Sequence, residues 1–171
     1  VASHVVALRR VHTLLRAKNI HAADIQAVGH RVVHGGQRFK QPSRMTAAVE
    51  RAIRQAAVLA PLHNPPAVTC IRSARTLFPK AVQYAVFDTG LYVDLPDRQR
   101  MYALPQRVSR SFAIERYGFH GLSHAYVLDA VATRLKKPAR TLNVLSVHLG
   151  SGSSITAFKH GKAVATSMGF T

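Results

Sequence analysis

The chain has 171 residues, of which 47% are hydrophobic, enough for the core of one domain or parts of two, and this composition excludes a disordered or fibrous protein. No stretch approaches the roughly 18 apolar residues of a membrane span, the N-terminal VASHVVALRRVH carries charges where a signal peptide needs an apolar block, and the single cysteine excludes an internal disulfide, so we expect a soluble, cytoplasmic protein. With 24 Lys and Arg against 7 Asp and Glu the formal net charge is +17, so nucleic acid and small anions must both be weighed as partners.

The first part of the chain is predicted to form a helix and then a strand. Ser3 can cap a helix that reaches about residue 18, because apolar residues recur there at helical spacing. Residues 25–34 are predicted to form a strand. Gly35 and Gly36 end it, and glycines permit a positive φ and a close approach of backbones.

Two helices are predicted next. The first covers residues 47–59. The second is predicted to begin with Asn64 as its N-cap and to run to about residue 77. Pro65 and Pro66 fill its first turn, where a missing N–H costs nothing.

The second part of the chain also alternates between strand and helix. Residues 81–87 are predicted to form a buried strand that ends at Asp88. Residues 91–106 lose the period and contain two prolines, so a linker and any domain boundary are expected there. The remaining predictions are helices over 107–115 and 123–136, a strand over 142–148, and a meander of short strands to the end. The pattern is that of an α/β protein.

Chemically useful side chains gather near the predicted strand ends, glycines and prolines. In open α/β sheets ligands bind outside the carboxyl ends of strands, so this grouping indicates a site. The candidates are Arg31, His34, His63, Asn64, Asp88, Thr89, His120, His124 and His148.

The segment HRVVHGG carries His30 and His34 four residues apart. A zinc site of the HExxH type would need a helix and a glutamate, but the glutamate is absent and the valines favour a strand. On a strand Arg31 and Val33 share one face, and a guanidinium beside an apolar residue suits a small carboxylate with a short alkyl tail. A surface arginine beside a core valine is the alternative.

Three other segments each allow a functional and a structural interpretation. Leu62 and His63 stand just before a helix start, which favours anions, or they belong to an exposed capping loop. Asp88 follows an apolar strand, where it can hold Mg²⁺ through water or orient a phosphoryl acceptor, or it only forms a turn. The glycines and hydroxyls from His148 to Ser154 can cradle a phosphate, or form a plain hairpin.

The segment RYGFHGLSHAYV places His120 and His124 four residues apart. Metal binding is disfavoured because no carboxylate or cysteine accompanies the pair at ligand spacing. His120 lies in a turn before a helix, and His124 lies in the first helical turn after Ser123, where a structural or supporting role is expected.

Together the motifs HRVVHGG, APLHNPP, VFDTG, YALP, RYGFHGLSHAYV, HLGSGSS and TSMGFT, in this order, closely resemble the acetate kinase family of the actin and sugar-kinase superfamily. The resemblance runs from about residue 25 to residue 171. It implies an α/β, ribonuclease H-like fold, a homodimer with the active site in an interdomain cleft, and a phosphotransferase whose acceptor is a carboxyl group. The implied reaction moves the γ-phosphoryl of ATP reversibly to acetate, giving acetyl phosphate and ADP, with Mg²⁺.

On the acceptor side the resemblance assigns five residues. Arg31 resembles the arginine that binds the acetate carboxylate and the phosphoryl group, which gives it a substrate-binding and a catalytic role. Val33, Leu62 and Phe119 are similar to the walls of a methyl pocket, and His63 to a supporting active-site histidine.

On the phosphoryl side Asp88 matches the essential strand-end aspartate that positions acceptor or metal, and His120 matches the histidine that stabilises the transferring phosphoryl. The nucleotide-side hairpin is represented by His148, Gly150, Ser151 and Gly152. Such catalysis is mainly positioning and charge stabilisation. Acetate is already ionised near neutral pH, so no proton need be abstracted.

The sequence also departs from the family pattern. Gly90, Leu91 and Tyr92 replace a small residue, Phe and His, while Ser151 replaces Asn and Leu122 replaces Thr. The family's first phosphate loop, its PLEG motif, second active-site arginine, adenosine pocket and Mg²⁺-binding glutamate have no counterpart in this chain. We therefore expect an internal fragment, inactive alone and without a metal site of its own.

The expected fragment contains parts of two domains. Residues 1–91 would be the remainder of the N-terminal domain and residues 92–171 the start of the C-terminal, nucleotide-side domain. Two alternatives remain. Propionate kinase shares these motifs, and a non-catalytic basic module would bind nucleic acid or another polyanion, although the basic residues are scattered rather than clustered.

Overall fold

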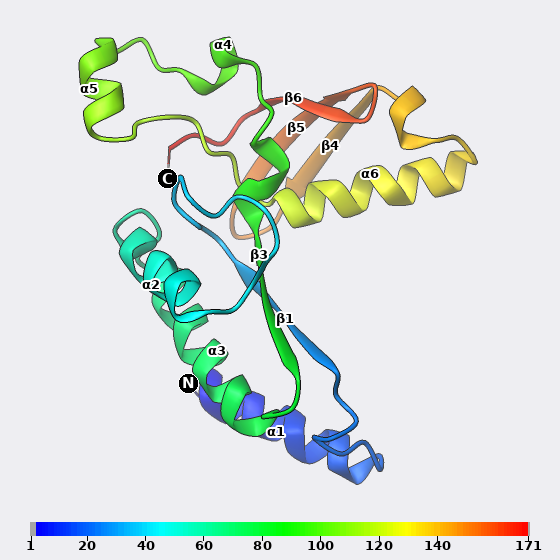
Figure 1. Ribbon diagram of the computed structural model, residues 1–171. Helices are drawn as coiled ribbons and strands as arrows, with labels where there is room; N and C mark the ends of the chain where they lie inside the picture. The colour runs from blue at the N-terminus through cyan, green and yellow to red at the C-terminus, as the bar shows by residue number, and fades with distance from the viewer. Residues whose placement is uncertain (1–2, 171) are drawn as a thin grey trace. The chain divides into compact units, whose positions relative to one another are not determined.

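The computed structural model describes residues 3–170, and the chain divides into two compact units, Val1–Phe87 and Asp88–Thr171, called here the first and second unit (Figure 1). Thr171, which ends the TSMGFT motif, lies outside the described residues. The domain boundary expected between residues 91 and 92 stays a prediction, since it concerns the domains of a longer protein.

The first unit begins with the expected helix, α1 (His4–Ala17). The Ser3 hydroxyl accepts a hydrogen bond from the first turn at 3.3 Å, which is the predicted cap. Leu8 and Leu15 pack against the cluster around Phe78. All residues of α1 are described and none is fully buried, so its apolar face is only partly covered.

A three-stranded sheet forms the centre of the first unit, in the order β1-β3-β2. β1 (Ala27–Val32) runs parallel to β3 (Val82–Phe87), and β2 (Ser43–Arg44) pairs antiparallel with β3. β1 is shorter than the predicted 25–34 because its pairing with the six residues of β3 ends at Val32. β2 was not predicted, since two residues show no periodicity.

Helices cover this sheet. α2 (Ala47–Gln55) is capped by Thr46 and ends earlier than the predicted residue 59, passing into the 3-10 turn η1 (Ala56–Val58). α3 (Asn64–Leu77) packs against β1, and both α1 and α2 pack against α3 (Figure 1). The core of the unit consists of Val32, Val49, Ile53, Val68, Ile71, Ala85 and Phe87.

Asn64 differs from its predicted role as an N-cap. His63 occupies the cap position and the Asn64 side chain is fully buried. Its Nδ2 donates to the carbonyls of His34 and Ile53, both at 2.9 Å, and its Oδ1 accepts from the His34 N–H at 3.3 Å. Asn64 therefore ties the end of β1 to α2 and α3, because three buried backbone groups there need partners.

The second unit opens with short helical segments in place of the predicted linker. They are η2 (Asp88–Tyr92) and α4 (Asp97–Arg100). α5 (Gln106–Ser111) is the helix that was predicted over 107–115, and it ends at Ser111.

The rest of the second unit is one helix on an antiparallel sheet. α6 (Gly121–Leu135) lies along the sheet β4-β5-β6 (Figure 1), and it starts two residues before the predicted position. The strands are β4 (Val144–Leu149), β5 (Ser153–Lys159) and β6 (Lys162–Thr166), with η3 (Ala139–Thr141) before them. Tyr92, Leu95, Leu128, Phe158 and Ala163 form the core.

In the part of the chain that the structure describes, no helix combines the length and the apolar character needed to cross a membrane.

Candidate active-site residues

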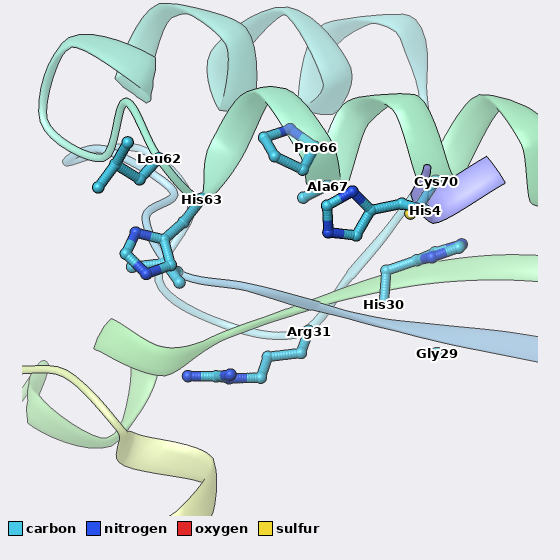
Figure 2. Close-up of a pocket in the computed structure, with 10 residues that line it drawn as sticks. His4, Gly29, His30, Arg31, Leu62, His63, Pro66, Ala67 and Cys70 are labelled. Atoms are coloured by element: carbon cyan, nitrogen blue, oxygen red, sulfur yellow. The ribbon is translucent and has the colours of Figure 1, made fainter. Parts of the chain in front are cut away.

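A pocket in the first unit brings together four of the residues assigned to the acceptor side. Arg31, Val33, Leu62 and His63 line a cavity of about 420 Å³. Figure 2 shows Arg31, Leu62 and His63 at one end of this pocket, with His4, His30 and Cys70 at the other. Pro66, Ala67 and Gly29 complete the lining. The lining thus contains Arg31 and Val33, which were expected to share a face, but also His30, which was expected on the opposite face. Binding of a small carboxylate here stays a prediction.

The helix start beside this pocket has few amide donors to offer an anion. The Asn64 N–H donates to the Ala60 carbonyl at 2.9 Å, and the Ala67 N–H donates to the His63 carbonyl at 3.2 Å. Pro65 and Pro66, between them, have no N–H. An anion here must rely on side-chain cations such as Arg31, so the predicted contribution of helix N–H groups is wrong.

The double glycine after β1 provides the positive φ and the close backbone approach that its residue type permits. Gly36 has φ +67, and a Cβ on Gly35 would lie 2.0 Å from the Phe39 carbonyl oxygen. The ring of His34 is fully buried, and its Nδ1 accepts from the Gly36 N–H at 2.9 Å. His34, a candidate from the sequence, thus serves the turn and does not line the pocket.

Asp88 lies where β3 passes into η2, and it is fully buried. A Cβ on Gly121 would approach the Asp88 carbonyl oxygen to 2.1 Å, so the first residue of α6 sits directly against this backbone. The neighbouring Thr89 is buried, and its hydroxyl has no hydrogen-bond partner among residues 3–170.

His120 precedes α6 in a strained backbone conformation. Its φ of 58 and ψ of 23 are left-handed, which costs a non-glycine residue about 1 kcal/mol or more and occurs preferentially at functional sites. Tyr92 supports this turn: its hydroxyl donates to the Phe119 carbonyl at 2.9 Å, and its ring would lie 2.5 Å from a Cβ on Gly118. Burial raises the pKa of Tyr92 to about 12, so the hydroxyl stays protonated.

Phe119 itself is almost completely buried in the second unit and is absent from the lining of the pocket in Figure 2. Its assignment to the methyl pocket therefore stays a prediction.

Three histidines and three serines form a cluster between α6 and its sheet. His120 Nδ1 and His124 Nε2 each lie 2.8 Å from Ser154 Oγ. His124 Nδ1 lies 2.8 Å from Ser146 Oγ. The rings of His120 and His148 stack, with centroids 4.1 Å apart and planes at 18°. In addition, His148 Nδ1 lies 2.9 Å from Ser123 Oγ.

The electrostatics of this cluster favour a neutral His124. Burial lowers its pKa most, nearby His148 and His120 lower it further, and Asp88 acts in the opposite direction. His124 is fully inaccessible, in agreement with the supporting role expected for it.

The hairpin between β4 and β5 approaches His120 closely. The Gly150 N–H donates to the Gly152 carbonyl at 3.0 Å, which closes the turn. A Cβ on Gly152 would lie 3.2 Å from both Cε1 and Nε2 of His120. Ser151, at the tip, is exposed. The hairpin predicted for the nucleotide side therefore lies against the histidine predicted for the phosphoryl.

A metal site is absent from the described part of the chain. Residues 3–170 contain no group of three or more His, Cys, Asp or Glu side chains that could hold an ion. Asp88 provides one carboxylate, and Mg²⁺ is commonly held by one or two carboxylates together with waters and substrate phosphates, so Asp88 could supply one ligand although these residues form no complete site.

Sequence reasoning missed Ser146, and it placed Ser154 only in the hairpin from His148 to Ser154, not beside the histidines of α6. Ser146 on β4 and Ser154 on β5 are buried, and each occupies an inward position of an alternating strand. A hydroxyl at such a position needs a hydrogen-bond partner, which was the available signal.

The chain is similar to known proteins. Residues 1–171 match the Acetokinase family. The chain belongs to the acetokinase family. Acetate kinase 1 of Vibrio cholerae is 45% identical over 161 residues, which are 94% of this chain and 40% of that relative. An acetate kinase of a Shewanella species is 48% identical with the same coverage. The chain thus spans about 40% of the length of these curated relatives.

Solved structures of an acetate kinase and a propionate kinase are also similar to this chain. A propionate kinase of Francisella tularensis gives a TM-score of 0.88 at 39% identity, and an acetate kinase of Porphyromonas gingivalis gives 0.85 at 34%. Each comparison covers 99% of this chain and 43% of the solved chain. The family resemblance and the α/β fold of incomplete actin and sugar-kinase type are confirmed.

Proposed function

We propose that this chain is part of an acetate kinase, which transfers the γ-phosphoryl of ATP reversibly to acetate. The observation that carries the proposal is the approach of Gly152 to His120, 3.2 Å from a Cβ position to Nε2. It sets a ring nitrogen against the glycine hairpin that resembles a phosphate-binding loop. Family membership supplies the reaction class.

The proposed chemistry needs charge stabilisation more than a base. An acetate oxygen attacks the γ-phosphorus while the bond from that phosphorus to the bridging oxygen of ADP breaks, giving acetyl phosphate and ADP. Arg31 would bind the carboxylate and the equatorial oxygens, and His120 would donate to the moving phosphoryl. Asp88 would orient the acceptor side, and Val33, Leu62, His63 and Phe119 would surround acetate.

The remaining family expectations belong to this proposal. Mg²⁺ accompanies ATP, with ligands from outside residues 3–170, and His148, Gly150, Ser151 and Gly152 contact the nucleotide phosphates. A homodimer in the cytoplasm is the expected assembly and location. Binding of a polyanion by the +17 chain stays an alternative, which the absence of DNA and RNA binding at about 0.1 M salt would remove.

The test is acetyl phosphate formation, trapped as hydroxamate, from ATP, Mg²⁺ and acetate. A chain of full family length that carries this segment is expected to turn over at roughly 1–100 s⁻¹. The 171-residue chain alone is expected to be inactive, because most transition-state contacts are missing.

Variants tie this activity to the proposed residues. His120→Ala in the longer chain is expected to lower kcat about 100- to 1000-fold, as for loss of a phosphoryl-stabilising donor. His21→Ala, at an exposed histidine outside the cluster, is the control and should leave kcat unchanged. An unaltered kcat in His120→Ala would refute the assignment.

Propionate kinase is the second candidate, favoured by the structural match to the Francisella enzyme. The ratio of kcat/KM for propionate and acetate decides between the two, since one methylene in an apolar pocket is worth roughly 10- to 200-fold.

A further inference from the structure

The second unit contains an unbroken series of hydrogen bonds, called here the hydrogen-bond chain, that includes His120. It runs from Ser146 through His124 and Ser154 to His120, and all three of its contacts measure 2.8 Å. Ser146, His124 and Ser154 are each at most 2% exposed. Of the four residues of the hydrogen-bond chain, only His120 is partly accessible.

The number of hydrogens decides the direction of this chain. Each serine hydroxyl carries one hydrogen, and a neutral histidine carries one on a single ring nitrogen. Among residues 3–170, Ser146 Oγ has His124 as its one hydrogen-bond partner. If His124 donated to Ser146, the buried Ser146 hydroxyl would have no acceptor, which costs about 1–3 kcal/mol.

The opposite direction satisfies every hydroxyl. The Ser146 O–H donates to His124 Nδ1, the His124 Nε2–H donates to Ser154 Oγ, and the Ser154 O–H donates to His120 Nδ1. His120 Nδ1 is then an acceptor, so the hydrogen of a neutral His120 must be on Nε2. That nitrogen is the one beside Gly152.

We propose that Ser146, His124 and Ser154 are positioning residues that hold His120 as a neutral Nε2–H tautomer and point this donor at the phosphoryl group. The inference rests on the proposed function for the identity of the ligand, but the tautomer itself does not. In this arrangement His120 donates a hydrogen bond without gaining a proton, and its orientation is fixed before substrate binds.

A second observation agrees with the neutral form. His148 stacks on His120 with the ring centroids 4.1 Å apart, and two imidazolium charges at that separation would repel each other. The pKa of His124 is lowered by burial and by His148 and His120, so His124 is also neutral within the hydrogen-bond chain.

The first test is the tautomeric state of the histidines in the unmodified, ¹⁵N-labelled 171-residue chain, read from long-range ¹H–¹⁵N correlation spectra near pH 7.5. The expected result is Nε2–H on both His120 and His124, with Nδ1 unprotonated. A proton on Nδ1 of either ring would overturn the proposal. This measurement needs no substrate and no variant, so it remains decisive even if a substituted protein fails to fold.

The second test removes the link next to His120. Ser154→Ala is expected to release His120 into a mixture of tautomers and, in a chain of full family length, to lower kcat about 10- to 100-fold with KM for both substrates nearly unchanged. Thr156→Val is the matched control. It deletes another buried hydroxyl of β5, bonded to Tyr92, and should leave the His120 tautomer and kcat within about twofold.

The outcomes separate the two proposals. If the longer chain makes no acetyl phosphate while the tautomers are as expected, the proposed function fails but the hydrogen-bond chain stands. If Ser154→Ala leaves kcat unchanged in an active enzyme, or Thr156→Val lowers it equally, the positioning role is refuted.

Discussion

The candidate residues of the two units are held in opposite ways. In the first unit Arg31 and His63 are exposed side chains of an open pocket, and Leu62 is 82% exposed. In the second unit His124 is completely buried between two serines, and His120 is fixed by a left-handed backbone and a hydrogen bond.

This difference corresponds to two tasks. Groups that only bind a small acid, as proposed for Leu62 and His63, can be mobile, since their order is gained when the acid arrives, at a cost in affinity. Arg31 is the exception in the first unit, because it is also proposed to bind the transferring phosphoryl. Groups that stabilise a transferring phosphoryl act best when they are already oriented, because reorganisation would raise the barrier. We therefore expect substitutions in the second unit to alter folding and kcat, and substitutions at the pocket to alter substrate affinity.

The largest contrast is expected between two glycines. Gly121→Ala would place a Cβ 2.1 Å from the Asp88 carbonyl oxygen, and backbone cannot move aside cheaply. We expect the second unit to lose about 3 kcal/mol or more of its free energy of unfolding.

Gly29→Ala is the matched substitution in the first unit. A Cβ there meets no heavy atom of the described residues within 4 Å, and Gly29 has no positive φ. The free energy of unfolding should change by less than about 1 kcal/mol, in the stabilising direction. Urea denaturation, followed by the amide resonances of α6 and of β1, measures the free energy of unfolding of each unit in the two variants. Equal losses in Gly121→Ala and Gly29→Ala would contradict this prediction.

Much of the fold could be predicted from local patterns. Ser3 is the predicted cap, Gly36 adopts the positive φ that only its residue type adopts freely, and β3 ends at Phe87, directly before Asp88, as its apolar run indicated. These features depend on neighbours within a few residues, which a sequence displays directly.

Features that depend on distant partners were not predictable in this way. Asn64 looked like a helix cap, but its amide serves the carbonyls of His34 and Ile53, 30 and 11 residues away. Ser146 became part of the candidate site, and Ser154 gained its contacts with histidines, only through the packing of α6 on the sheet, which no local pattern displays. The roles of Arg31 and Asp88 came from family resemblance and stay predictions.

A smaller effect concerns the pH dependence of stability. Burial lowers the pKa of His124 below 6.5, helped by His148 and His120 and opposed by Asp88. The unfolded chain therefore binds more protons as the pH falls below about 6.5, and the second unit loses stability from there down to the folded pKa of His124. The slope from this one group is at most about 1.4 kcal/mol per pH unit.

His30 gives the first unit a counterpart for this measurement. Its pKa is also lowered, by burial first and by Arg75, while the hydrogen bond to Gln83 opposes the shift. The first unit should therefore also lose stability as the pH falls below about 6.5. His124→Gln should reduce the pH dependence of the free energy of unfolding reported by α6 resonances alone, and His30→Gln that reported by β1 resonances alone. An effect of either variant on the other unit would contradict the assignment.

The smallest effect on folding is expected at the pocket, where affinity should change instead. Leu62→Ala removes a side chain that is 82% exposed, so the free energy of unfolding should move by less than about 0.5 kcal/mol. If Leu62 closes over the alkyl end of the bound acid, kcat/KM in a chain of full family length falls roughly tenfold, and more for propionate than for acetate. Val58→Ala is the control, since Val58 is 83% exposed but lies outside the pocket. If both variants lost kcat/KM equally, contact of Leu62 with the acid would not be the cause of the loss. The proposal that the first unit determines substrate affinity would then be contradicted.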